Sequence, residues 1–188
     1  MGWVYVNRCA ESTKHLVSGV ACNMRTKGMG GHHSSAMLKD EWLTPPELHS
    51  ALGEFDLDPC SPVNRPWDTA KNHLTIYDDG LNNPWTGRIW LNPPYGKKTG
   101  HWLSKLAEHG NGIALIFART ETEMFVDHVW RKADAILFIH GRLYFHHADG
   151  SRAKANAGAP SVLVAYGKNN VEALKSSKID GTLMLVPR

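Results

Sequence analysis

The sequence feature that most constrains the fold is an apolar run that stops at two consecutive prolines, residues 89–95 (IWLNPPY). Three apolar residues in a row are typical of the end of a buried strand. Pro93 and Pro94 have no N–H group to donate to a sheet, and both fix φ, so the strand cannot continue. The chain is therefore predicted to leave the sheet as a stiff loop at the strand's carboxyl end. Open α/β sheets bind their ligands at that edge.

The residue types in this loop suit a reaction on an aromatic amine. The lone pair of an exocyclic amine is delocalised into its ring, which makes the nitrogen a poor nucleophile. Asn92 offers a side-chain carbonyl and Pro93 a backbone carbonyl, and two acceptors on one NH₂ group would favour a tetrahedral nitrogen. Tyr95 supplies a flat face on which a base can stack. The alternative is a structural Pro-Pro turn with a packing tyrosine.

Length and composition exclude several classes of protein. The chain has 188 residues, enough for one full domain, and its net charge of +3 suits a polyanionic partner without proving one. It contains no apolar run of about 18 residues, so no membrane span is expected, and its N-terminus lacks a signal-peptide pattern. Three scattered cysteines without a CxxC pair suit a reducing cytoplasm. The histidine doublets at 32–33 and 146–147 lack partners at zinc-finger spacing, so no metal is expected.

The order of the motifs predicts one catalytic domain behind a flexible tail. Residues 1–39 have no sustained period and include a Gly-, His- and Ser-rich stretch, so they are expected to form a poorly ordered extension. The domain is expected to span residues 40–188. Thr44, Pro45 and Glu47 form a capping-box pattern with proline at the first helical position, and Gly53 is expected to end that helix.

A second candidate site follows the first predicted strand. Phe55 and Leu57 alternate with acidic residues, which predicts a short strand with one apolar face, ended by Pro59. Asp58 would then lie at the carboxyl end of the strand, where a carboxylate can bind the amino group or ribose of a nucleoside cofactor. An aspartate that only caps a turn is the alternative.

The rest of the chain alternates between predicted strands and helices. Residues 62–88 are rich in Pro, Asn and Asp and are expected to form a long irregular loop that closes over a ligand. Helices are expected around residues 102–109, after a capping box at Thr120 and Glu123, and from Val171. Continuous apolar strands alternating with helices indicate a three-layer α/β domain. The remaining strands are predicted at residues 113–118, 135–139, 161–166 and 183–186.

Taken in order, these motifs resemble the phage-type, Dam-like DNA N6-adenine methyltransferases, which carry a (D/N/S)PP(Y/F) motif. The resemblance covers residues 40 to 166, and the ordered set is more specific than any one member. It rests on DEW at 40–42, TP at 44–45, LDPC at 57–60, DDGL at 78–81, NPPY at 92–95, ART at 118–120, GRL at 141–143 and PS at 160–161.

The resemblance implies a single-domain class I (Rossmann-like) fold with an α/β/α sandwich, S-adenosylmethionine as methyl donor and adenine N6 of double-stranded DNA as acceptor. A site-specific enzyme of phage or prophage origin, with a role in restriction and modification in a bacterial cytoplasm, is implied as well. Nothing in the sequence indicates a protein partner. The residues that match the family's catalytic motif are Asn92, Pro93, Pro94 and Tyr95. The residues that match its cofactor motifs are Trp42, Thr44, Pro45, Asp58, Pro59 and Cys60.

Two departures accompany this resemblance. Methyltransferase cofactor motifs usually carry glycines that let the backbone approach the ligand, whereas Cys60 and Ser61 follow Pro59 here. No insertion is large enough for a separate target-recognition domain, so specificity is expected to reside in loops. The candidate DNA-binding residues are Arg119, Arg152 and Lys154, which are expected to contact phosphates.

Other functions remain compatible with the same residues. An Asn-Pro-Pro-Tyr loop could equally hold cytosine N4 in DNA, adenine in RNA or a glutamine amide. A catalytically silent nucleic-acid-binding module of the same fold is a further alternative. Intact Asn92 and Tyr95 and the lack of a large basic stripe disfavour the silent module.

Overall fold

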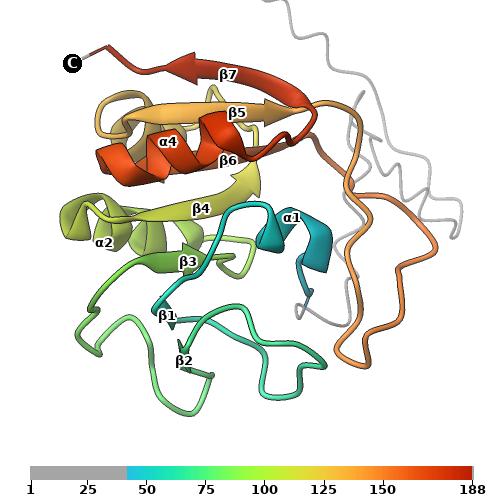
Figure 1. The fold of residues 1–188 in the computed structure, drawn as a ribbon. Coiled ribbons are helices and arrows are strands. Elements are labelled where there is room, and N and C mark those ends of the chain that lie inside the picture. Colours follow the sequence, from blue (N-terminus) through green and yellow to red (C-terminus); the bar gives the residue numbers. More distant parts are fainter. Residues whose placement is uncertain (1–41, 188) are drawn as a thin grey trace, which may run out of the picture. The chain divides into compact units, whose positions relative to one another are not determined.

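The apolar segment that precedes the prolines forms a strand near the middle of a seven-stranded mixed sheet (Figure 1). The computed structural model describes residues 42–187, and its strand order is β2-β1-β3-β4-β6-β5-β7. The strands from β2 to β4 pair in parallel, and the three pairs beyond β4 are antiparallel. The strands are β1 (Leu57–Asp58), β2 (Asn72–His73), β3 (Ile89–Leu91), β4 (Gly112–Phe117), β5 (Ala135–Ile139), β6 (Ser161–Tyr166) and β7 (Gly181–Leu185).

The helices follow from apolar residues at helical spacing. In α2, Trp102, Leu103 and Leu106 are buried, and Gly110 ends the helix with φ of 72°, a conformation that glycine adopts without strain. The chain of α3 continues without a break into one π-helical turn, η1. The helical elements are α1 (Pro46–Ser50), α2 (Thr99–His109), α3 (Glu123–Phe125), η1 (Val126–Trp130) and α4 (Lys168–Ser176).

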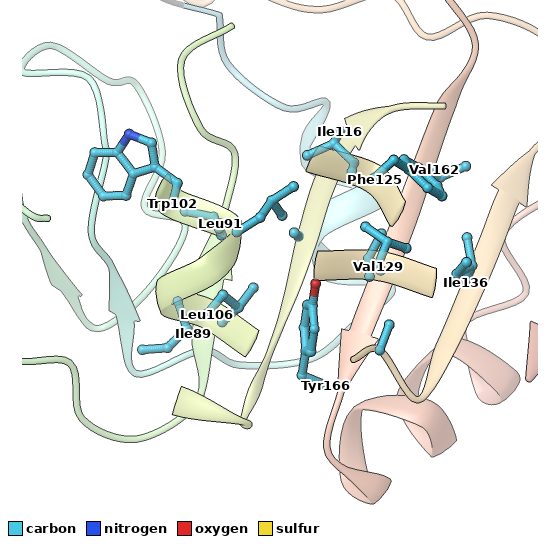
Figure 2. Packing of buried hydrophobic residues seen from close by; sticks show 14 of the residues in the cluster. Ile89, Leu91, Trp102, Leu106, Ile116, Phe125, Val129, Ile136, Val162 and Tyr166 are labelled. Carbon is cyan, nitrogen blue, oxygen red and sulfur yellow. The ribbon is translucent and has the colours of Figure 1, made fainter. Parts of the chain in front are cut away.

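Both faces of the sheet are covered, which explains why its central strands are continuously apolar. Ile89 and Leu91 of β3 pack into one buried cluster, which also contains residues of α2, α3 and η1 (Figure 2). Trp90 points the other way, into a second cluster that contains residues of α1 and α4. Figure 1 shows α1 and α4 on the same face. The strand alternation thus fixes both layers of helices at once.

Most predicted elements are confirmed, and the exceptions lie in polar segments. The strands expected at 113–118, 135–139, 161–166 and 183–186 correspond to β4, β5, β6 and β7 within two residues. The short strand β2 was not predicted, because its residues, Asn72 and His73, are polar and interrupt a turn-rich loop. Phe55 and Leu57 do not share one apolar face: only Leu57 is in β1, and the two side chains belong to different clusters.

The two predicted capping boxes are both wrong. Pro45, not Thr44, is the N-cap of α1, and no side chain caps that helix. At α3 the N-cap is Thr122 rather than Thr120, and its side chain accepts a hydrogen bond from the backbone N–H of Phe125. In both cases a hydroxyl at suitable spacing was present, but the backbone enters the helix one or two residues later. The Thr44 hydroxyl therefore does not cap α1.

The predicted tail, residues 1–39, lies outside the described residues, so its boundary with the domain at residue 40 stays a prediction. Within residues 42–187, no helix has the length and apolar character needed to cross a membrane.

A buried asparagine connects α4 to the sheet and is expected to be important for stability. Asn170 is fully buried; its amide donates to the Tyr166 carbonyl (2.7 Å) and to Asn111 (3.0 Å), and its oxygen accepts from Arg88 (2.7 Å). Asn170→Ala removes these three hydrogen bonds at a buried position, and each net loss costs about 1–3 kcal/mol where a buried group is left unpaired. Urea denaturation should therefore show a loss of several kcal/mol. The matched control is Asn169→Ala at the exposed neighbouring position, and a similar loss in both variants would contradict the assignment.

Candidate active site

The predicted motifs meet in a cavity of about 530 Å³ at the carboxyl ends of β1 and β3. This volume is typical of a site for a small molecule or cofactor. The segment after β1, the Pro-Pro loop after β3 and the stretch that precedes α1 all contribute walls. Of the predicted catalytic and cofactor residues, only Pro45 does not line the cavity. Those that do are Trp42, Thr44, Asp58, Pro59, Cys60, Asn92, Pro93, Pro94 and Tyr95.

Asp58 is a buried carboxyl group with two hydrogen-bond donors already in place. One oxygen accepts from the backbone N–H of Cys60 (3.1 Å), and the other accepts from the hydroxyl of Thr69, which is also buried. Burial disfavours the charged form and raises the pKa of Asp58 to about 6, against the opposing effect of the two hydrogen bonds. Near neutral pH Asp58 is therefore mostly a carboxylate, and a further hydrogen-bond donor would stabilise its charged form.

Cys60 and Asn92 connect this carboxyl group to the Pro-Pro loop. The thiol of Cys60 donates to the backbone carbonyl of Asn92 (3.2 Å), and burial raises the pKa of that thiol, which keeps it protonated. The side-chain amide of Asn92 donates to the carbonyl of Trp42 (3.1 Å). Because a carbonyl can only accept, this bond places the amide nitrogen toward Trp42 and fixes the position of Asn92 Oδ1. Asn92 Oδ1 is buried and has no donor among the described residues.

Unsatisfied polar atoms are concentrated around this cavity. Among the described residues, eleven buried side-chain polar atoms lack a hydrogen-bond partner, and five of them belong to residues that line the cavity. Each such group costs about 1–3 kcal/mol unless a partner arrives. The cavity is therefore suited to a polar ligand with both donors and acceptors. The five atoms are Trp42 Nε1, Thr44 Oγ1, Asn92 Oδ1, the Tyr95 hydroxyl and Trp102 Nε1.

Tyr95 is held rigidly by a second aromatic ring. It stacks on Phe117 with 4.2 Å between ring centroids and 8° between ring planes. Its hydroxyl is buried and has no hydrogen-bond partner within residues 42–187, and burial raises the pKa of Tyr95 above its usual value. One face of the ring is therefore covered by Phe117, so a base could stack only on the opposite face.

The three predicted DNA-binding residues lie outside the cavity. Arg119 follows β4, and its backbone N–H donates to the carbonyl of Phe117 (2.8 Å). Arg152 and Lys154 are exposed, in the hairpin between β5 and β6. Alanines next to them, Ala153 and Ala155, line a small groove of about 70 Å³ together with Tyr95 and Phe117, so this segment lies beside the Pro-Pro loop.

Sequence reasoning missed several residues around the cavity. Thr69 and His73 lie in the loop that was expected to be irregular, and no sequence pattern marks either of them. Lys98 and Trp102 line the cavity from the start of α2. The two consecutive lysines at positions 97 and 98, shortly after the two prolines, were the available signal for a positive charge at the cavity, where Lys98 lies.

Comparison with known proteins then identifies the family. The family model described as DNA N-6-adenine-methyltransferase (Dam) matches residues 31–179, well over half of the chain. The chain belongs to this family. It is a DNA N6-adenine methyltransferase, and DNA is its substrate. No curated protein and no solved structure gave a match.

A neutral histidine supports the buried carboxyl group of this Dam-family enzyme. His73 Nε2 accepts from the backbone N–H groups of Thr69 (3.2 Å) and Ala70 (3.3 Å), which positions the Thr69 hydroxyl against Asp58. Its side chain is 7% exposed. Burial is the largest cause that lowers the pKa of His73 below 6.5, and the positive charge of Arg65 adds to it.

His73 should make stability depend on pH. Because its pKa is lower in the folded state, the unfolded chain binds the proton more tightly, and stability present above pH 6.5 is lost as the pH falls toward the folded-state pKa. His73→Gln keeps an acceptor that does not titrate. The melting temperature of the wild type should therefore fall more than that of this variant between pH 7.5 and 5. His101→Gln, at an exposed position of α2, is the control, and identical pH profiles for wild type and His73→Gln would refute the role.

Proposed function

We propose that this methyltransferase uses S-adenosylmethionine and methylates adenine N6 in double-stranded DNA, with Asn92 holding the target amino group. The observation that carries this proposal is the buried, donor-less oxygen Asn92 Oδ1, fixed by the hydrogen bond from the same amide to Trp42. The atom is shielded from solvent, so its donor has to come from a group that enters the site. The exocyclic amine of adenine is such a group.

The sheet supports a class I, Rossmann-like fold with three layers. Four neighbouring strands run parallel, the carboxyl ends of β1 and β3 border the cavity, and helices pack on both faces of the sheet. Ligands of doubly wound sheets bind at this edge. The antiparallel half of the sheet, from β6 to β7, does not contribute to the cavity lining.

The cavity residues fit S-adenosylmethionine. Asp58 can accept hydrogen bonds from the cofactor's ribose hydroxyls or ammonium group. The polar side-chain atoms of Thr44, Trp42 and Trp102, which have no hydrogen-bond partner among the described residues, suit a ligand that is polar at several positions. When bound, this cofactor supplies an electrophilic methyl group on its sulfonium sulfur. The walls around Asp58, formed by residues 58–62, 75–76 and 79–81, are proposed to hold it.

Gly80 lets its loop pack directly against the backbone of Pro59, the residue that follows Asp58. A Cβ atom built on Gly80 would lie 1.9 Å from the carbonyl oxygen of Pro59, so only glycine fits there. Lys105 holds the same loop by donating to the carbonyls of Leu81 (2.6 Å) and Asn83, and Trp85 donates to Gly80 (2.8 Å). Gly80 therefore sets the contact between two walls of the cavity, the segment after β1 and its own loop.

The Pro-Pro loop prepares the acceptor nitrogen. Asn92 Oδ1 and the carbonyl of buried Pro93 each accept one N–H of the adenine amino group, which draws its lone pair out of the ring and toward the methyl group. These bonds strengthen as positive charge develops on nitrogen, so they act mainly in the transition state. Because a duplex hides this amine, the base has to leave the stack, and the uncovered face of Tyr95 receives it.

The family resemblance extends the proposal to a site-specific enzyme encoded by a phage or prophage. Its activity would then act on DNA in the cytoplasm of a bacterial host, in restriction and modification. No other acceptor is favoured by a particular contact in the cavity, so cytosine N4 and RNA adenine are outcomes that product analysis would reveal.

The raised pKa of Asp58 gives cofactor binding a defined pH dependence. If only the carboxylate accepts the cofactor's donors, affinity is constant above pH 6 and falls as the pH drops below it, by up to about tenfold per unit. Asp58→Asn should bind about tenfold to a hundredfold more weakly at pH 7.5 and lose this dependence. Titration calorimetry with S-adenosylmethionine measures both, with Glu172→Gln on the exposed side of α4 as control. A wild-type affinity that does not change from pH 7.5 to 5 would eliminate Asp58 as a ligand.

Loss of Asn92 Oδ1 should affect the rate rather than cofactor binding. Asn92→Ala is expected to lower the single-turnover rate of DNA methylation by roughly 100-fold or more, because a preorganised contact to the developing charge is lost. Its affinity for S-adenosylmethionine should change little. Quench-flow with labelled cofactor, followed by nucleoside chromatography, gives the rate and identifies the methylated base. Asn169→Ala is the matched control, and a wild-type rate in Asn92→Ala would mean that the loop is only a turn.

A further inference from the structure

Arg152 is prepared for a contact that the described part of the protein does not supply. Its guanidinium carbon lies 4.3 Å from the ring centroid of Tyr144, and both side chains are exposed. It makes no hydrogen bond or ion pair with any residue in the described range. Other arginines are engaged: Arg65 and Arg131 pair with aspartates, and Arg88 contacts Asn170 and the Glu54 carbonyl.

The backbone that carries Arg152 is fixed in a short hairpin. His147 and Ser151 are joined by a backbone hydrogen bond (2.9 Å), and Asp149 accepts from the backbone N–H (2.8 Å) and hydroxyl (2.6 Å) of Ser151. His146 forms isolated β-bridges to both Leu43 and Arg152. The hairpin hydrogen bonds thus fix the backbone of Arg152, and the Tyr144 ring contacts its guanidinium.

This hairpin lies next to the proposed site of the target base. Leu43, the bridge partner of His146, lines the main cavity. Ala153 and Ala155 line the small groove that Tyr95 and Phe117 also border. Along this segment, Arg152 and Lys154 alternate with the two alanines, so their side chains are available to DNA that delivers a base to Tyr95.

We propose that Arg152, whose guanidinium lies over the ring of Tyr144, determines sequence specificity by binding the major-groove edge of a guanine near the target adenine. This inference rests on the proposed function. A guanidinium that packs over an aromatic ring through its carbon still has N–H groups to donate, and two of them match O6 and N7 of guanine. Lys154 has no aromatic ring beneath it in the described part of the chain, and we assign it to a phosphate.

The stack on Tyr144 favours a base edge over a phosphate as the partner of Arg152. A phosphate accepts from many directions, so an arginine that only neutralises charge gains little from a fixed orientation. Bidentate binding to guanine requires the plane of the guanidinium to match the plane of the base. The contact with Tyr144 restricts the Arg152 side chain before binding, which lowers its ordering cost.

The test compares the binding of duplexes that contain one target adenine and randomised flanking pairs. Wild type should prefer guanine at one flanking position. Arg152→Ala should reduce that preference by about tenfold to a hundredfold and leave non-guanine duplexes nearly unaffected. Arg152→Lys keeps the positive charge but lacks the paired N–H donors of a guanidinium, so it should not restore the preference for guanine. Tyr144→Leu should weaken the preference, whereas Tyr144→Phe, which keeps the ring, should retain it.

Lys154→Ala is the matched control in the same hairpin. It should weaken all duplexes alike and reduce the slope of log affinity against log salt by about 0.9. If Arg152→Ala behaves in that way too, or if wild type shows no guanine preference, the inference is overturned. Methylation of the same duplexes separates this result from the proposed function. If adenine is methylated but Arg152→Ala loses affinity equally for all duplexes, only this inference is refuted. If the wild type prefers guanine but does not methylate adenine, only the proposed function is refuted.

Discussion

The hydrogen bond from the Asn92 amide to the Trp42 carbonyl joins segments fifty residues apart and organises the site around it. It orients the amide, and through Cys60 the same loop is connected to Asp58 and then to Thr69 and His73. One chain of hydrogen bonds thus connects Asp58, where the cofactor is proposed to bind, with Asn92, where the target base is proposed to bind. A displacement at either end would misplace the acceptor oxygen, and the rigid prolines at positions 93 and 94 limit such displacement.

The central fold was predictable from the sequence because its signals are physical and local. The strands β4, β5 and β6 are continuously apolar, since helices cover both of their faces. Two prolines after β3 had to end the strand whatever the surrounding structure. The end of α2 followed equally directly from Gly110. The order and direction of β5, β6 and β7 could not be predicted, because apolar patterning specifies burial and not the neighbour of a strand.

The candidate site was predictable only in part, because its supporting residues act through distant contacts. Asp58 stood out as the last residue of a predicted strand, and Asn92 because it directly follows one. Thr69 and His73, which position Asp58, are polar residues in a turn-rich loop and have no marked pattern. The spacing from Glu47 assigned Thr44 to a helix cap and the family resemblance assigned it to the cofactor motifs. Thr44 does not cap the helix, and it does line the cavity with its hydroxyl buried. Local pattern identifies a hydroxyl that could cap a helix, but the packing of the chain decides where that hydroxyl points.

The neutral side chain at position 92 is consistent with the electrostatics of the cavity. Asp58 is the one buried acid among the described residues that line it, and burial already raises its pKa to about 6. A second carboxylate at position 92, which is joined to Asp58 through Cys60, would repel the first and raise its pKa further. Asp58 would then be largely protonated near neutral pH and would lose its value as an acceptor. An amide oxygen accepts the same N–H without adding charge, so the site can keep Asp58 ionised and still hold an amine a short distance away.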